Sequence, residues 1–230
     1  MENKENGVVL RPIAYIRTDF TEKFGIPRQS GRAPSLLGRI IFTPEYRNDD
    51  ALRGITGYTY LWLIFDFTQS HMAGWSPTVR PPRLGGNRRM GVFATRSPFR
   101  PNPLGLSCVK LEGLEKTPQG TIIHVSGVDI HDNTPIYDIK PYLPHADCKP
   151  DAAGGFSDTQ TGYHLEVDFP EELLTVLPEE KRTAAVECLA DDPRPSYQND
   201  DREYSMSFAG YDIHFHVADG VLTVTGVDVL

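Results

Sequence analysis

Residues 60–67 read YLWLIFDF and are apolar or aromatic throughout except for Asp66. Eight residues suit a β-strand and are too few for a typical helix, so the run predicts a strand that is buried on both faces. The chain that follows, over residues 75–107, is rich in Pro and Gly, which break helices and mark turns. We therefore expect a rigid strand that leads directly into a long, stiff loop.

Short segments with strand patterning dominate the rest of the chain. Further strands are predicted at residues 8–17, 104–111, 121–130 and 165–169, and a closing hairpin at 211–217 and 221–229 with Ala218-Asp219-Gly220 as its turn. Residues 131–151 are dense in turn residues and predict a loop. The one convincing helix covers residues 179–189, and residues 48–54 predict one or two helical turns.

The domain organisation follows from this distribution of elements. Residues 150–163 are small, polar and Gly-containing, which is typical of a linker. The pattern favours a mostly β (α+β) chain, with a β-barrel-like domain over residues 1–150 and a small α+β domain over residues 164–230.

Charge is distributed unevenly along the chain. Residues 67–111 contain seven Arg and Lys residues and no carboxylate, although the whole chain carries a net charge of −8. A local positive field in an acidic protein concentrates an anionic partner at one place. The planar guanidinium group of Arg grips phosphate or carboxylate through two hydrogen bonds. An Arg-rich loop that is merely solvated is the alternative.

Several functional classes are disfavoured. Cys108, Cys148 and Cys188 lack CxxC spacing and predict reduced thiols. The chain shows no signal-peptide pattern and no apolar run of membrane-spanning length, so we expect a cytoplasmic protein. The glycines at 86 and 91 have phosphate-loop spacing but no Lys-Ser/Thr follows them, and a Rossmann GxGxxG is missing. His214 and His216 share a strand face without enough further ligands, so no metal site is predicted.

Four polar loops remain as candidates for a binding site. They contain Pro27-Arg28-Gln29, Thr68-Gln69, Arg96, and residues 129–132. If neighbouring strands of one barrel carry these loops, they converge at one rim. The rim would then offer both carboxylates and guanidinium groups, which suits a ligand that carries both charges.

Stretches of the chain closely resemble the TsaA-like family. They are PRQ at 27–29, GWSPTVRPPRLGGNRRMGVFATRSPFRPNPLGLS at 74–107, DNTPIYDIKPYLP at 132–144 and DDPRPSY at 191–197. The resemblance extends from about Arg11 to the end. It implies an S-adenosylmethionine-dependent tRNA methyltransferase that acts on the N6 nitrogen of threonylcarbamoyl-adenosine beside the anticodon. It also implies a single-sheet β-barrel methyltransferase domain, a small C-terminal domain and a homodimer.

The same resemblance implies which residues hold S-adenosyl-L-methionine. They are Pro27, Arg28, Gln29, Thr68, Gln69, Arg96, Leu106, Asp129, Ile130, His131 and Asp132. The chain departs from the family pattern at Thr68, where relatives have His, and at Asn133, where relatives have Gly. Asn tolerates a left-handed backbone nearly as well as Gly, so the second change is mild. The first is expected to alter a cofactor contact without abolishing binding.

The candidate catalytic residues follow from the chemistry of methyl transfer. The acceptor nitrogen is weakly nucleophilic, and its proton must leave around the transfer. Asp138 or Asp132 is a candidate acceptor, and Lys140 or Arg96 would stabilise a developing anion. Alternatively, Asp138 and Lys140 form an ion pair that shapes their own turn. The residues expected to bind phosphates of the anticodon arm are Arg80, Arg83, Arg88, Arg89 and Arg100. Arg194 and Tyr197 are expected to contact the substrate. A packing role is the alternative for these last two residues.

Two competing functions stay open from the sequence. The first is an RNA-binding β-barrel without catalysis. The second is a methyltransferase of the same fold that acts on another small or nucleotide substrate.

Overall fold

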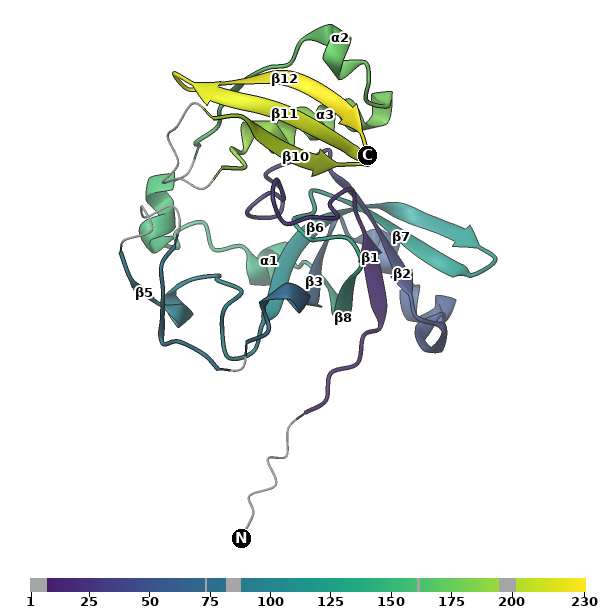
Figure 1. The fold of residues 1–230 in the computed structure, drawn as a ribbon. Helices are drawn as coiled ribbons and strands as arrows, with labels where there is room; N and C mark the ends of the chain where they lie inside the picture. Colours follow the sequence, from purple (N-terminus) through teal and green to yellow (C-terminus); the bar gives the residue numbers. More distant parts are fainter. Residues whose placement is uncertain (1–7, 73, 82–87, 161, 195–201) are drawn as a thin grey trace.

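The computed structural model describes residues 8–72, 74–81, 88–160, 162–194 and 202–230 (Figure 1). Six strands form a closed antiparallel barrel in the order β1-β2-β7-β6-β3-β8. They are β1 (Ala14–Arg17), β2 (Leu37–Phe42), β3 (Tyr60–Asp66), β6 (Leu104–Thr117), β7 (Gly120–Ser126) and β8 (Thr134–Pro141). Because the sheet closes on itself, each of these strands has a hydrogen-bonded neighbour on both sides. The predicted mostly β architecture with a barrel is confirmed.

Alternate side chains of each strand fill the barrel. Leu61 and Leu63 of β3 are fully buried, whereas Tyr60 is 42% exposed. The expectation that both faces of this strand are buried is therefore wrong. The run is apolar throughout because its outer face also packs partly: Trp62 lies against Tyr142, with 5.9 Å between ring centroids.

A second, four-stranded sheet lies beside the barrel and is drawn in yellow and green in Figure 1. Its order is β10-β11-β12-β9, with β9 (Glu166–Asp168), β10 (Tyr204–Phe208), β11 (Tyr211–Ala218) and β12 (Val221–Val229). The helices α2 (Glu171–Leu174) and α3 (Glu179–Ala190) accompany it, and α3 buries Ala184, Ala185, Cys188 and Leu189. The predicted helix and closing hairpin are both confirmed. Asp219 and Gly220 have φ values of 50° and 82°, which are the left-handed conformations that a tight two-residue hairpin requires.

Strand β8 was not predicted, because its sequence TPIYDIKP looks like a loop. In the structure it pairs with β1 on one side and β3 on the other, which closes the barrel. The pairing with β3 is irregular between Ile64 and Phe65, and such irregularity accommodates a proline-flanked strand. The loop expected at residues 131–151 is therefore wrong for β8, and tertiary pairing overrides the local signal.

Other boundaries also differ from the expectation. Strand β7 ends at Ser126 and not at residue 130, because Gly127 turns the chain with a φ of 70°. Strand β1 begins at Ala14 and not at residue 8. Strands β2 and β10 had no counterpart in the sequence-based prediction. Within residues 48–54 the structure has one 3₁₀ turn, Asp49–Leu52, and a second such turn, Ile55–Gly57, follows Gly54. All three cysteines are free thiols, as predicted.

The connection between β1 and β2, residues 18–36, joins the barrel to the second sheet. Phe20 is fully buried and lies against Phe208, with 5.3 Å between ring centroids. At Gly25 an added Cβ atom would lie 2.5 Å from side-chain atoms of Met206, so the backbone passes closely under the sheet. Lys181 forms a 2.7 Å ion pair with Asp19. The barrel and the second sheet therefore share one continuous apolar core.

None of the helices in the described ranges is long and apolar enough to span a membrane. The short ribbon of β4 (Thr78–Val79) and β5 (Met90–Gly91) stands apart from both sheets, at the left of Figure 1.

Candidate functional site

Three loops that carry expected cofactor residues leave the same end of the barrel. Residues 18–36 follow β1, residues 67–103 follow β3, and residues 127–133 follow β7. In an antiparallel barrel, every second connection lies at the same end, so the pairing order brings these three loops together. This common end faces the second sheet, because residues 18–36 pack against it.

A cleft of about 2060 Å³ opens beside this end of the barrel. Its walls come from the loop after β1, from the Arg-rich segment at residues 75–107, and from residues at and after the end of α3 in the C-terminal domain (residues 162–230). Arg28, Gln29 and Arg96 line it. Other lining cations are Lys23, Arg32, Arg80, Arg89 and Arg100, and the carboxylates are Asp191 and Asp192. The cleft is thus mainly basic, although the chain as a whole is acidic.

The expected cofactor residues contact one another across the loops. Arg96 Nη1 donates a 2.6 Å hydrogen bond to Gln29 Oε1. The amide nitrogen of Gln69 lies 3.0 Å from His131 Nε2, and Lys23 Nζ donates to the backbone oxygen of Gln69 at 3.1 Å. Sequence reasoning placed these residues in four separate loops, and the structure brings them together. Lys23 was not among the predicted site residues.

Asp129 occupies a crowded position at this rim. Ser107 Oγ donates a 2.5 Å hydrogen bond to Asp129 Oδ1. Burial raises the pKa of the Asp129 carboxyl to about 6, and hydrogen bonds together with the charge of Arg96 oppose that rise. Leu106 precedes Ser107 in β6, so its side chain points to the other face of the strand, where it is 54% exposed.

Asp132 is held on the barrel side of the rim. Its Oδ1 atom accepts hydrogen bonds from Arg17 Nε and from the backbone N–H of Thr18, both at 2.9 Å. Asn133 has a φ of 58°, which is the left-handed conformation that Gly and Asn adopt more readily than other residues. Asn133 therefore adopts a backbone conformation that its residue type tolerates; that the departure from the family pattern is mild stays a prediction.

The remaining cofactor candidates present less side chain to the rim. Pro27 and Ile130 are buried, so contacts with a ligand would involve their backbone atoms. Thr68 is exposed at the start of the 3₁₀ turn Thr68–Ser70.

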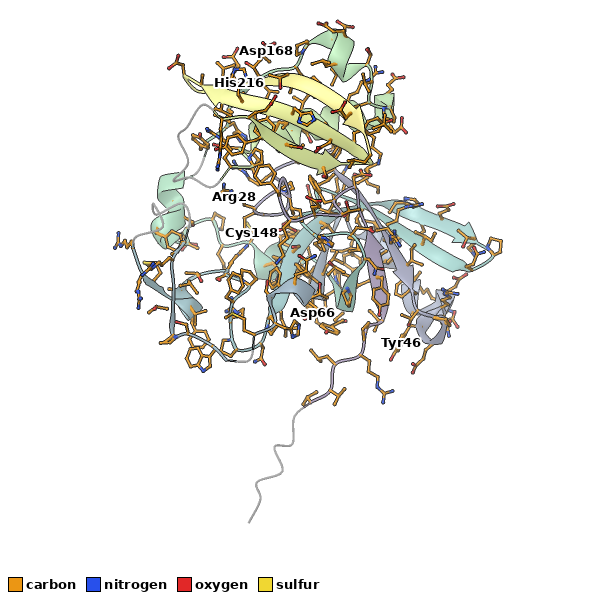
Figure 2. All side chains as sticks on the ribbon, viewed as in Figure 1. Arg28, Tyr46, Asp66, Cys148, Asp168 and His216 are labelled. Carbon is orange, nitrogen blue, oxygen red and sulfur yellow. The ribbon has the colours of Figure 1, made fainter. Side chains whose placement is uncertain are left out.

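Arg28 lies between the barrel and the second sheet (Figure 2), and its side chain contacts the segment that follows α3. Its backbone N–H donates to Asp191 Oδ2 at 3.2 Å, and its guanidinium group donates to the backbone oxygens of Asp192 and Arg194. Arg32 Nε pairs with Asp191 at 2.6 Å. Arg28 therefore ties the barrel loop to the DDPR segment.

Arg194 is only 7% exposed and pairs with Asp192 through Nε at 2.9 Å. This position fits the packing alternative better than a contact with RNA phosphate. Its neighbour in the same motif, Tyr197, lies outside the described residues.

The Arg-rich segment places its described guanidinium groups at or near the cleft. Arg80, Arg89 and Arg100 line it, and Arg88 is exposed beside Arg89. Arg100 Nη1 donates to the backbone oxygen of Thr95 at 3.2 Å, which fixes its direction. Arg83 lies outside the described residues.

Asp138 and Lys140 form an ion pair of 2.8 Å. They are on β8, opposite Ile64 and Trp62 of β3, and both side chains are substantially exposed. They do not line the cleft. The arrangement matches the alternative in which the pair shapes its own segment.

A carboxylate–imidazole pair was missed by sequence reasoning. His71 Nε2 lies 2.8 and 3.0 Å from the two carboxylate oxygens of Asp66, which is only 9% exposed, and His71 lines the cleft. An Asp within an apolar strand, followed five residues later by a His, is the signal that could have revealed it.

The described residues contain no group of three or more His, Cys, Asp or Glu side chains that could hold a metal ion. His214 instead lies 2.9 Å from Asp228 on the surface of the last hairpin.

Two family models match the chain and together cover nearly all of it. Residues 15–148 match the tRNA-methyltransferase O N-terminal domain, and residues 162–230 match the TrmO C-terminal domain. The chain belongs to the tRNA-methyltransferase O family.

Relatives of this family resemble the chain over its length. The tRNA (adenine(37)-N6)-methyltransferase of Escherichia coli is 40% identical over 228 residues, which cover 94% of this chain and 96% of that protein. The enzyme of the same description from Eikenella corrodens is 46% identical over 172 residues, which cover 74% and 97%. A crystal structure of TrmO from Pseudomonas aeruginosa superimposes with a TM-score of 0.79 at 33% identity, covering 96% and 98% of the two chains.

Proposed function

We propose that this tRNA-methyltransferase O family member transfers a methyl group from S-adenosyl-L-methionine to N6 of adenosine 37 in tRNA, where that base carries the threonylcarbamoyl group. The observation that supports this most directly is the basic cleft beside the rim formed by Gln29, Arg96 and Asp129. The phosphate backbone of tRNA binds to a positively charged surface. The cofactor needs a site of mixed charge next to that surface.

The donor set at the rim fits S-adenosyl-L-methionine. That molecule carries an ammonium and a sulfonium charge, a carboxylate and a purine. Asp129 and Asp132 offer carboxylates, Arg96 offers a guanidinium group, and Gln29 and Gln69 offer amides. When bound, the cofactor supplies an electrophilic methyl group. The chain's contribution is then to align the adenosine nitrogen with that group and to exclude water.

Arg80, Arg88, Arg89 and Arg100 are proposed to bind phosphates of the anticodon arm, with Arg83 as a further predicted contact. Arg194 is left out of this set because its side chain is buried against Asp192. Tyr197 stays a predicted substrate contact. Asp138 or Asp132 stays the predicted proton acceptor, and Lys140 or Arg96 the predicted group that stabilises the developing anion. His71, which lines the cleft with Nε2 2.8 Å from Asp66 Oδ1, is a further candidate acceptor.

We also propose an oligomeric state and a cellular location for the enzyme. Leu104 and Leu106 leave an apolar outer face on β6, 37% and 54% exposed, which a second copy would cover in the expected homodimer. Light scattering tests this, and the mass of a single chain at micromolar concentration would overturn it. Because tRNA is the substrate, we expect the protein in the cytoplasm.

An assay of methyl transfer with purified components tests the main proposal. The chain is incubated with S-adenosyl-L-methionine and with tRNA that carries threonylcarbamoyl-adenosine, and the digested nucleosides are analysed by mass spectrometry. We expect a mass increase of one methyl group on that nucleoside alone. tRNA without the threonylcarbamoyl group is the matched control. Methylation of a different nucleoside would contradict the proposal and favour a methyltransferase that acts on another substrate. No methylation together with no binding of the cofactor would contradict it and favour an RNA-binding barrel without catalysis.

A further inference from the structure

Two aromatic rings on the Arg-rich segment are unusually open to solvent. Phe93 is 74% exposed and Trp75 is 55% exposed, and both line the basic cleft. Each is a large apolar surface in contact with water, which costs free energy unless a partner covers it. Phe99, which is 49% exposed, and Met72, which is 67% exposed, line the same cleft.

The local structure holds these rings in place. Trp75 lies just before β4 and Phe93 just after β5, so the pairing of these two strands brings them together. The backbone N–H of Val92 donates to the oxygen of Pro77 at 2.9 Å and closes the base of the ribbon. The ring centroids of Trp75 and Phe93 are 6.1 Å apart with an interplanar angle of 31°. The Trp75 ring thus supports Phe93 and leaves much of the Phe93 ring open.

The charges around the rings indicate the chemistry of the occupant. Arg80, Arg89, Arg96 and Arg100 line the cleft with them, and residues 67–111 contain no carboxylate. Binding of an apolar protein surface would remove water from these guanidinium groups without replacing it by hydrogen bonds, which costs free energy. An unpaired nucleobase attached to phosphates satisfies both features, because its flat face stacks on an aromatic ring and its backbone pairs with Arg.

We propose that Phe93, supported by Trp75, is a stacking platform for an unpaired base of the tRNA anticodon loop. This inference rests on the proposed function and adds to it, since stacking selects single-stranded loops over helical RNA, whereas phosphate contacts with Arg do not. The platform thereby positions the loop for the neighbouring rim.

The chain has only two tryptophans, Trp62 and Trp75, which permits a direct test. In a Trp62→Phe variant, Trp75 is the sole tryptophan, and Trp62 lies outside the cleft with its Nε1 donating to Asp147. This variant is titrated with an anticodon stem-loop RNA and with a blunt duplex of the same number of phosphates, while anisotropy of labelled RNA records binding. We expect the fluorescence of Trp75 to change when the stem-loop binds and to stay nearly constant when the duplex binds. Equal responses to both RNAs, or binding of the stem-loop without a response, would overturn the platform.

Substitutions then separate stacking from simple apolar contact. Phe93→Tyr keeps a flat ring and should retain affinity, whereas Phe93→Leu and Phe93→Ala should each raise the Kd for the stem-loop about tenfold. Tyr58→Ala, an exposed aromatic residue that does not line the cleft, is the control and should bind normally. If Phe93→Leu binds the stem-loop as well as the wild type does, no base stacks on Phe93 and the platform is overturned.

The outcomes also distinguish this inference from the proposed function. Wild-type methylation of tRNA with unchanged affinity in Phe93→Ala would overturn the platform and leave the function standing. If neither tRNA nor stem-loop binds the wild type at all, both fail together. In every variant, calorimetry should show unchanged affinity for S-adenosyl-L-methionine, because neither ring takes part in the Gln29–Arg96 hydrogen bond at the rim.

Discussion

Ser107 and Asp129 meet at the rim of the barrel, where Ser107 Oγ donates a 2.5 Å hydrogen bond to Asp129 Oδ1. The pKa of this carboxyl is raised to about 6 from its ordinary 3.8, mainly through burial. A carboxyl group in this state costs stability when it ionises, and a bound cation would remove that cost. Such a group suits a site for a positively charged ligand better than a purely structural position.

The first prediction concerns stability against pH. Because the folded protein holds the Asp129 proton more tightly than the unfolded chain, this group stabilises the fold fully below pH 3.8. The contribution is lost as the pH rises through about 6. Relative to Asp129→Asn, the wild type should therefore lose up to about 3 kcal/mol of unfolding free energy between pH 4 and pH 7. Urea unfolding of both proteins at several pH values measures this difference, and parallel stability curves would refute it.

The second prediction concerns the cofactor. Arg96→Ala removes the group that contacts Gln29 at the rim, without removing any buried side chain. Loss of a charge-assisted hydrogen bond of about 1.5–3 kcal/mol should raise the Kd for S-adenosyl-L-methionine about 10- to 100-fold. Calorimetry measures the change. Arg53→Ala is the control, since Arg53 is an exposed residue paired with Asp50 away from the cleft, and equal affinities for both variants would contradict a cofactor role for Arg96.

The third prediction concerns salt. Each neutralised phosphate releases counterions, so the affinity for tRNA should fall steeply with rising salt. Arg88→Ala combined with Arg89→Ala should lower the magnitude of the log Kd against log salt slope by about 1.5 and raise the apparent KM for tRNA. Affinity for S-adenosyl-L-methionine should hardly change.

The control for this experiment is the double variant Arg11→Ala and Arg53→Ala, which removes the same charge from exposed positions outside the cleft. Titrations at three salt concentrations compare the three proteins. If the slopes are equal, Arg88 and Arg89 do not contact RNA and are merely solvated.

The fourth prediction concerns the joint between the barrel and the second sheet. Phe20 is fully buried against Phe208, so Phe20→Ala leaves a cavity and should cost about 3–5 kcal/mol. Because the core is continuous, the fluorescence and circular-dichroism transitions of this variant should shift together. Val229→Ala, at a position 75% exposed, should change stability by less than about 0.5 kcal/mol. Separate transitions for the two halves would show that they unfold independently.

Local sequence determined the elements whose stability depends on their own residues. The apolar run of β3 specifies a strand, Pro178 followed by Glu179 and Glu180 specifies the start of α3, and Asp219-Gly220 specifies the last hairpin. In each case the signal lies within a few residues, because backbone conformation and side-chain periodicity are local properties. The absence of carboxylates from residues 67–111 also predicted where a basic surface would lie.

Tertiary structure decided what depends on partners distant in the chain. Strand β8 forms because β1 and β3 satisfy its backbone on both sides, which its Pro-flanked sequence cannot reveal. In the sequence, Arg28 and Arg194 look like exposed basic residues. In the structure the backbone N–H of Arg28 donates to Asp191, and the Arg194 side chain pairs with Asp192. The sequence around Phe93 gives no sign of whether its ring is buried, and only the fold leaves it open beside Trp75. Burial and partner choice arise from contacts across many residues, so no local pattern can encode them.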